Sequence, residues 1–213
     1  MGATGTATAY DPLERRSTLV TAASLQALTP EVAKDFLRVD SDDEDVLVES
    51  LIAEAIDAIE RATGRALITQ TWDVKYPRFP DSGVPIELPR APLQGVTSVT
   101  YVDADGASQT WASSNYSVDA PAGPFAIRGR LIPGYEVTYP TTRLQPDAVT
   151  IRYTAGYGDA PEDVPGGLSL ALLRLVADGY AFRETAIAGA VLSENRALRG
   201  LVRRYRLDRV VAL

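Results

Sequence analysis

The stretch that decides the fold is Val149 to Pro165, "VTIRYTAGYGDAPEDVP", because the periodicity of its side chains changes within it. Apolar and polar residues alternate up to Ala155, which is the pattern of a β-strand with one buried face. Gly156 and Gly158 then interrupt the strand, and the acids that follow suit the positive end of a helix. Phosphate-binding loops need G-x-G-x-x-G, or a glycine followed by Lys and Ser or Thr, and this stretch has neither. We therefore predict a hinge from strand to helix without a phosphate site.

Composition limits the kinds of protein that the chain can be. Its 213 residues are 46% hydrophobic and 23% charged, which is ordinary for one domain or two small ones. Cysteine and histidine are absent, so disulfides, zinc-thiolate sites and Ser-His or Cys-His nucleophiles are excluded. We assign no catalytic, cofactor-binding or metal-binding residue and expect no enzyme activity. The formal net charge of −7 argues against a general nucleic-acid binder, whose affinity comes mainly from Lys and Arg.

Membrane and secretory segments are not predicted. The longest apolar run begins at Leu168 and is broken by Arg174 and Asp178, so we interpret it as a buried helix. The N-terminus lacks a basic start followed by an apolar core, and its small residues suggest a flexible lead-in. Acids gather in residues 40–60 and arginines in residues 196–209, an asymmetry that favours contact between one copy's end and another surface.

Helix signals stand on both sides of the middle of the chain. Thr29 followed by Pro30 is a typical helix start. Residues 43–63 place apolar side chains three and four positions apart, Gly64 can end that helix, and the Asp and Ser residues before it can cap it. We predict helices near residues 30–39, 43–63, 165–184 and 194–207. Apolar contacts of the first helix are expected from Val32, Phe36, Leu37 and Val39.

Between the helices the period changes from 3.6 to 2, which indicates strands. Residues 70–76 alternate as a strand with one half-buried face, and Asp105-Gly106 is a hairpin signal. Frequent prolines favour short strands with bulges and corners. The other candidate strands are residues 85–89, 96–103, 109–119, 135–140 and 148–156.

The predicted fold class is α+β, a small helical body of about four helices with an inserted antiparallel β-domain. The helix that begins near Leu168 is apolar almost all round, so it is expected at the centre, packed on the helix of residues 43–63. The expected parts are a flexible lead-in (1–28), the first part of the helical body (29–66), the inserted β-domain (67–157), the central helix (158–190) and a basic C-terminal helix and tail (191–213).

A calcium site is one alternative use of the acidic run before the second helix. Asp40, Asp42 and Glu44 alternate as the ligands of a calcium loop do. An EF-hand loop, however, has glycine at its sixth place and glutamate at its twelfth, where this chain has Asp45 and Leu51. The helix-capping interpretation is preferred.

Two further alternatives use the same chain in another way. A carboxylate enzyme could employ Asp103 and Asp105, or the cluster at Asp40, as acid and base. A carbohydrate-binding module could use the aromatic residues of the strands as a stacking platform. Turns and caps require acids at those positions, and aromatic residues spread over several strands more often form core and cross-strand pairs.

Three longer phrases carry a resemblance to a known family. They are "LRVDSDDEDVLVESLIAEAIDAIERATGRALITQTWDV" (37–74), "IELPRAPLQGVTSVTYVDADG" (86–106) and "DAVTIRYTAGYG" (147–158), followed by a proline-led apolar helix. In this order they resemble the phage head–tail connector (adaptor) proteins of long-tailed phages, prophages and gene transfer agents. The resemblance covers about residues 18–185 and weakens after Phe182.

The resemblance implies a structural virion protein of the head–tail junction, made in the cytoplasm of the bacterial host. Members of the family form a ring, usually of twelve copies, beneath the portal protein. The ring extends the DNA channel without binding DNA specifically, and it docks a stopper or tail-completion protein. No membrane, cofactor or catalytic residue is implied. Within the neck, the alternative is that the chain is itself a stopper or tail-completion protein.

Contact residues are expected from charge and amphipathic pattern. The C-terminal segment is expected to be mobile in the free protein and to become fixed on the portal, the alternative being that its helix packs on its own body. Portal contacts are expected from Leu198, Leu201, Val202, Arg203, Tyr205, Arg206, Arg209, Val210, Val211 and Leu213. Contacts between protomers are expected from Asp42, Asp43, Glu49, Glu54, Asp57, Arg61 and Arg65.

Overall fold

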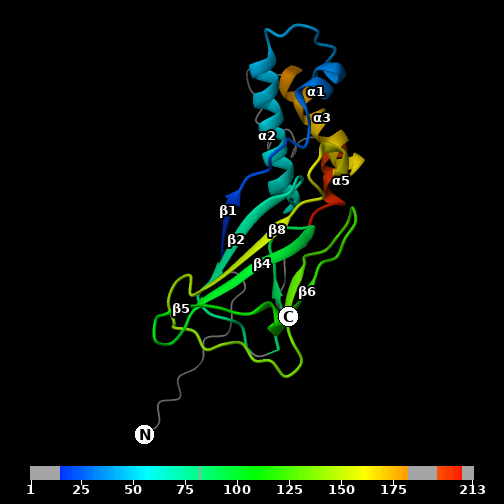
Figure 1. Ribbon diagram of the computed structural model, residues 1–213. Helices are drawn as coiled ribbons and strands as arrows, with labels where there is room; N and C mark the ends of the chain where they lie inside the picture. The colour runs from blue at the N-terminus through cyan, green and yellow to red at the C-terminus, as the bar shows by residue number, and fades with distance from the viewer. Residues whose placement is uncertain (1–14, 82, 182–195, 208–213) are drawn as a thin grey trace.

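The computed structural model describes residues 15–81, 83–181 and 196–207. Helices gather at one end of an elongated molecule and strands at the other (Figure 1). The first strand, β1 (Arg16–Thr21), is followed by the helices α1 (Pro30–Leu37) and α2 (Asp45–Thr63). The other strands come next, and the helices α3 (Gly166–Ala181) and α5 (Arg196–Arg203) follow them. The predicted fold class is confirmed: an antiparallel β-region is inserted into a helical body. None of the described helices combines the length and the hydropathy needed to span a membrane.

The helix ends follow the expected local chemistry. Thr29 caps α1, because its Oγ1 accepts a hydrogen bond from the Val32 N–H at 3.4 Å. Gly64 ends α2 in the left-handed conformation, and its N–H donates to the Glu60 carbonyl. The expected apolar contacts of α1 are wrong in part, since Val32 and Phe36 are exposed while Ala33 is its buried residue.

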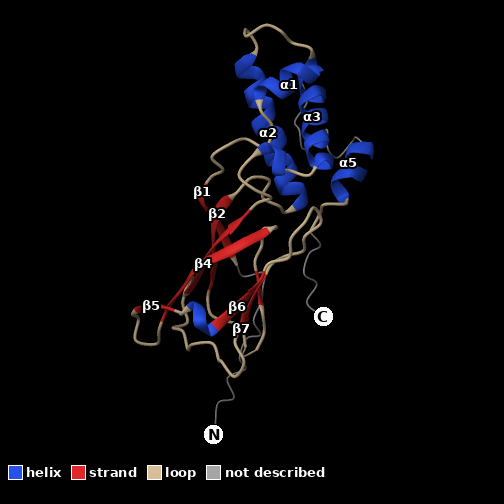
Figure 2. Ribbon diagram, turned by 45° about the vertical axis from the view of Figure 1, so that its right-hand side comes forward, coloured by secondary structure: helices blue, strands red, loops and turns tan. Residues whose placement is uncertain are grey.

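The helical core forms where α3 packs on α2, with α1 and α5 completing it (Figure 2). As the apolar run predicted, α3 supplies much of this core, although Leu170 on its outer side is exposed. Buried side chains at a spacing of three and four face one another across the two helices. On α2 they are Val48, Ile52, Ala55 and Ile59, and on α3 they are Leu168, Ala171, Leu172, Leu175 and Val176.

The strands form two antiparallel sheets. The five-stranded sheet has the order β1-β2-β8-β4-β5, and the three-stranded sheet has the order β3-β7-β6. The strands are β1 (Arg16–Thr21), β2 (Gln70–Tyr76), β3 (Ile86–Glu87), β4 (Leu93–Val102), β5 (Ser108–Thr110), β6 (Tyr116–Asp119), β7 (Arg130–Pro133) and β8 (Val149–Ala155). Strand β8, the first half of the opening stretch, lies at the centre of the larger sheet. It pairs with β2 over seven residues and with β4 on its other side.

The β-region has its own apolar core, separate from that of the helices. This core includes the buried rings of Trp72, Tyr76, Trp111 and Tyr153, and Phe79 stacks on Tyr139 with ring centroids 5.0 Å apart. The hairpin predicted at Asp105-Gly106 joins β4 to β5, with Gly106 at a φ of 91°. The strand expected at residues 135–140 is wrong. That segment is a loop, and the strand instead comprises residues 130–133.

Residues 16–21 form strand β1, although the sequence predicted a flexible lead-in up to residue 28. Strand β1 lies at the edge of the larger sheet, and all six of its residues are exposed. Its order comes from backbone pairing with β2, from Arg16 opposite Lys75 to Thr21 opposite Thr71. An exposed strand lacks the apolar alternation that identifies strands in a sequence, which explains the error.

The hinge between sheet and helices depends on close backbone approach. Gly156 has a φ of 149°, and a Cβ atom there would lie 2.5 Å from the Thr69 nitrogen. The Gly158 carbonyl accepts a hydrogen bond from the Thr69 N–H at 2.9 Å. A short 3-10 turn at Pro161–Asp163 then leads into α3. The glycines therefore serve backbone geometry, as the opening stretch predicted.

Arg90 links the two parts of the molecule. Its guanidinium lies over the Trp72 ring of β2, 4.6 Å from the ring centroid. One nitrogen of the same group donates to the Glu60 carbonyl near the end of α2, at 3.1 Å. The β-region is thereby tied to the helical body by side chains as well as by the chain itself.

Candidate assembly surfaces

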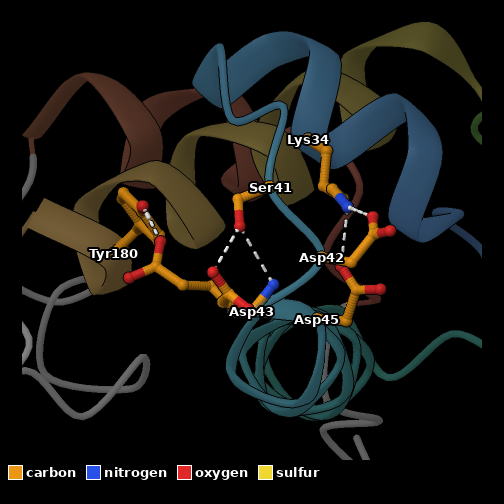
Figure 3. A network of polar contacts seen from close by, with 7 residues as sticks. Lys34, Ser41, Asp42, Asp43, Asp45 and Tyr180 are labelled. Carbon is orange, nitrogen blue, oxygen red and sulfur yellow. Dashed lines mark hydrogen bonds and ion pairs between the residues drawn. The ribbon is translucent and has the colours of Figure 1, made fainter.

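The acidic run before α2 is held by a lysine of α1. The Lys34 ammonium donates to Asp42 at 2.8 Å and to Asp45 at 2.7 Å (Figure 3). These hydrogen bonds raise the pKa of Lys34 and lower the pKa of the Asp42 carboxyl. The Asp42 side chain remains exposed, so it can still meet another molecule.

The other residues of this run do not cap α2 as expected. Ser41 Oγ accepts from the Asp43 N–H at 3.2 Å and donates to the Asp43 carboxylate at 2.8 Å, which closes a local turn. Glu44 is the N-cap residue and makes no side-chain bond to the helix amides. Its carboxylate instead accepts from the Tyr180 hydroxyl at the end of α3 (Figure 3). The run thus connects helices through their side chains.

The predicted protomer-contact residues of α2 fall on its exposed side. Asp57 and Arg61 form an ion pair one turn apart, with both side chains exposed. Glu49 is exposed near the start of the helix, and Glu54 is half-buried. These four residues lie on α2, and the other two candidates, Asp42 and Asp43, come directly before it.

Arg65 differs from the other protomer-contact candidates because it lies inside the chain. Its exposed fraction is 2%, and its Nε donates to the backbone carbonyl of Tyr205. Burial lowers the pKa of Arg65. The C-terminal segment folds over this side chain, so Arg65 does not offer an exposed charge to another molecule.

The apolar face of the C-terminal helix packs on its own body. Leu198, Val202 and Tyr205 are buried within the helical core, and Leu201 packs against it. This is the alternative that the sequence left open, and it corrects the expectation that these side chains are free for a portal protein. Arg203 and Arg206 remain exposed. Arg209, Val210, Val211 and Leu213 lie outside the described residues.

A recess of about 280 Å³ lies where the C-terminal segment meets the β-region. We call it the arginine pocket, since Arg65, Arg128, Arg130, Arg204 and Arg206 line it together with Glu87 and the apolar residues Phe125, Ala126, Ile127 and Leu207. The sequence indicated only the arginines of the C-terminal end. The other arginines of the pocket come from the loop after α2 and from residues 128–130. No local sequence pattern therefore predicts that they lie together.

The residues proposed for an enzyme or a glycan platform are used structurally. Asp103 accepts hydrogen bonds from Gln109 and from the Ala107 and Asp105 amides, which lower its pKa and close the β4–β5 hairpin. Trp111 and Tyr153 are buried in the β-core and offer no surface to a sugar.

Comparisons with known proteins identify the class. The fold matches a chain from the "Neck of empty GTA particle computed with C6 symmetry", GTA being a gene transfer agent, with a TM-score of 0.76 and 28% identity. That match covers 93% of this chain and 98% of the other. A chain from the "Neck of native GTA particle computed with C12 symmetry" matches with a TM-score of 0.71 and 26% identity, over 93% and 98% of the two chains.

The fold is therefore that of the structural neck proteins of virus-like particles. Residues 31–109 match the family described as Phage gp6-like head-tail connector protein. This match and the likeness to the neck chains agree with the resemblance that the sequence phrases carry. No curated protein matches it.

Proposed function

We propose that the chain forms a ring of identical copies at the head–tail junction of a virion, beneath the portal protein. The observation that carries this proposal is the likeness of nearly the whole chain to neck proteins whose particles were computed with C6 and C12 symmetry. A ring of twelve copies agrees with both symmetries. The ring extends the DNA channel and presents a surface to a stopper or tail-completion protein.

The function is structural and not enzymatic. Support comes from the absence of histidine and cysteine in the sequence. The acids at Asp103 and before α2 are engaged in turn and helix contacts among the described residues. In this proposal residues 67–157 act as one inserted domain to which strand β1 adds, and the helices before and after it act as one helical body.

Charged side chains make the contacts between protomers. Acids on and before α2 meet basic side chains of the next copy, with Arg61 among the residues at this contact. The acids are Asp42, Asp43, Glu49, Glu54 and Asp57. Ion pairs of exposed side chains are screened by salt, so assembly weakens as ionic strength rises.

The portal contact lies at the C-terminal end. Since the apolar face of α5 is buried in its own core, the contact uses Arg203 and the tail of residues 208–213 instead of that face. Arginine is suited to bind acidic groups of a partner through paired hydrogen bonds.

The test is assembly with the portal protein of the same particle, followed by electron microscopy and mass photometry across a salt series. We expect rings on the portal at low salt and fewer at high salt. Deletion of residues 208–213 and, separately, Arg203→Glu should weaken portal capture, whereas Arg143→Glu on an exposed loop of the β-region should not. If the wild type formed no rings, the proposed ring would be refuted. If the portal protein captured both C-terminal variants as well as the wild type, the proposed portal contact would be refuted.

A further inference from the structure

Arg65 leaves a buried hydrogen-bond donor unused. Its Nη1 atom is buried and has no acceptor among the described residues, although its Nε bonds to the Tyr205 carbonyl. A buried guanidinium N–H without an acceptor is unfavourable, and Arg65 forms no ion pair with a described residue. Arg65 also lines the arginine pocket, so a donor without an acceptor lies in the wall of this recess.

The rest of the lining also favours an anion. Arg204 and Arg206 are exposed and form no ion pair within the described part of the chain. The Nε atom of Arg130 lies 3.8 Å from the Asp119 carboxylate, and Glu87 is the acidic residue of the lining. Arg65, Arg204 and Arg206 against one glutamate give the pocket a surplus of positive charge even when Arg128 and Arg130 are left out of the count. Guanidinium groups bind carboxylate oxygens through short, paired hydrogen bonds.

The rim of the pocket indicates that the anion belongs to a protein. Phe125 and Ile127 are 57% and 56% exposed, and the Phe125 ring stacks on Tyr205 with centroids 5.0 Å apart. Exposed apolar side chains beside a charged recess suit a protein segment that carries a carboxylate among apolar residues. A phosphate of DNA brings no apolar group to this rim.

The chain itself supplies suitable acids. Asp40, Glu49 and Glu162 are exposed and form no ion pair within the described ranges. A ring joins unlike surfaces of neighbouring copies, so a basic recess on one copy can meet acids on the next. Resting on the ring proposed above, we infer that the arginine pocket receives a carboxylate side chain from a second copy of this chain. Arg206 is thereby assigned to this contact and not to the portal.

The experiment measures self-association of the full chain by sedimentation over a concentration series at low salt. Arg204→Gln with Arg206→Gln removes two charges at the pocket wall. The matched control, Arg174→Gln with Arg203→Gln, removes two exposed helix charges outside the lining. We expect the pocket variant to associate at least about tenfold more weakly, and the control to change by less than about threefold. Both should keep the melting temperature of the wild type, because the exchanged side chains are exposed.

Each other result counts against the inference. Equal association of wild type and pocket variant would overturn it while leaving the ring intact, and a wild type that never associates, alone or on the portal, would overturn both. An equal loss in the control would mean that overall charge, not the pocket, governs association. A fluorescent DNA duplex forms the second arm. If the pocket variant alone lost binding to this DNA while its self-association stayed unchanged, the pocket would be assigned to a DNA phosphate.

Discussion

The guanidinium of Arg152 and the carboxylate of Asp73 form a two-point ion pair across the centre of the larger sheet. Arg152 Nε donates to Asp73 Oδ1 at 2.8 Å, and its Nη2 donates to Asp73 Oδ2 at 2.9 Å. The two residues are direct partners in the register of β2 and β8. This pair therefore holds together the strand that enters the β-region and the strand that leaves it.

Removing either partner should have unequal effects. The Asp73 side chain is 11% exposed and the Arg152 side chain 44%, so Arg152→Ala leaves a nearly buried carboxylate without its partner. We expect Arg152→Ala to lower the melting temperature by roughly 2–6 °C, and Asp73→Ala to lower it less, because a freed Arg152 can reach water. Thermal unfolding followed by circular dichroism measures both. A larger loss in Asp73→Ala would contradict this account.

Glu60 should make stability depend on pH. Burial raises its pKa above the ordinary value of 4.5, against the opposing effects of its hydrogen bonds from Leu67 and Gln70 and of Arg90. A raised carboxyl pKa means that the folded state holds the proton more tightly than the unfolded chain does. Burial of the ionised Glu60 carboxylate therefore lowers the stability of the folded state. This loss is absent below about pH 4.5, grows as the pH rises toward the raised pKa, and is complete above it.

Glu60→Gln removes this charge and keeps an oxygen that can accept from the Leu67 amide. The melting temperature of the variant should exceed that of the wild type by a margin that widens between pH 4.5 and neutrality. Parallel melting curves of the two proteins across this range measure the margin. A constant difference would mean that the carboxylate is not penalised by burial.

The hinge glycines should differ sharply in their tolerance of alanine. Gly156 has a positive φ, and a Cβ atom would lie 2.5 Å from the Thr69 nitrogen, so Gly156→Ala should cost roughly 2–4 kcal/mol of unfolding free energy. Gly166 opens α3 with open space around it, and Gly166→Ala should change stability by less than about 1 kcal/mol. Urea titration compares them. Similar values for both would show that the hinge has room to adjust.

The C-terminal helix should contribute to the stability of the free chain. Leu198 is fully buried in the helical core, so Leu198→Ala should lower the unfolding free energy by about 2–4 kcal/mol. Leu201 packs only partly against that core, so the same change there should cost less. Denaturant unfolding provides the values. No loss in Leu198→Ala would restore the expectation of a mobile segment that folds only on a partner.

Local patterns in the sequence determined the elements and their order. The change of period from 3.6 to 2 and back set the α+β class, while Thr29, Gly64 and Asp105-Gly106 set a helix start, a helix end and a hairpin. These signals act within a few residues, because caps and turns bond their own neighbours. The resemblance to the head–tail connector family also followed from the sequence, as its phrases lie mostly in such elements.

Only the tertiary structure decided which charges are free. In the sequence, Arg65 is indistinguishable from the other charged residues near the end of an amphipathic helix. In the structure it donates a hydrogen bond to the carbonyl of Tyr205, 140 residues away. Strand β1 likewise owes its order to pairing with β2 and not to any apolar face. The arginine pocket joins three distant segments for the same reason: burial and partnership depend on long-range packing, which no local period records.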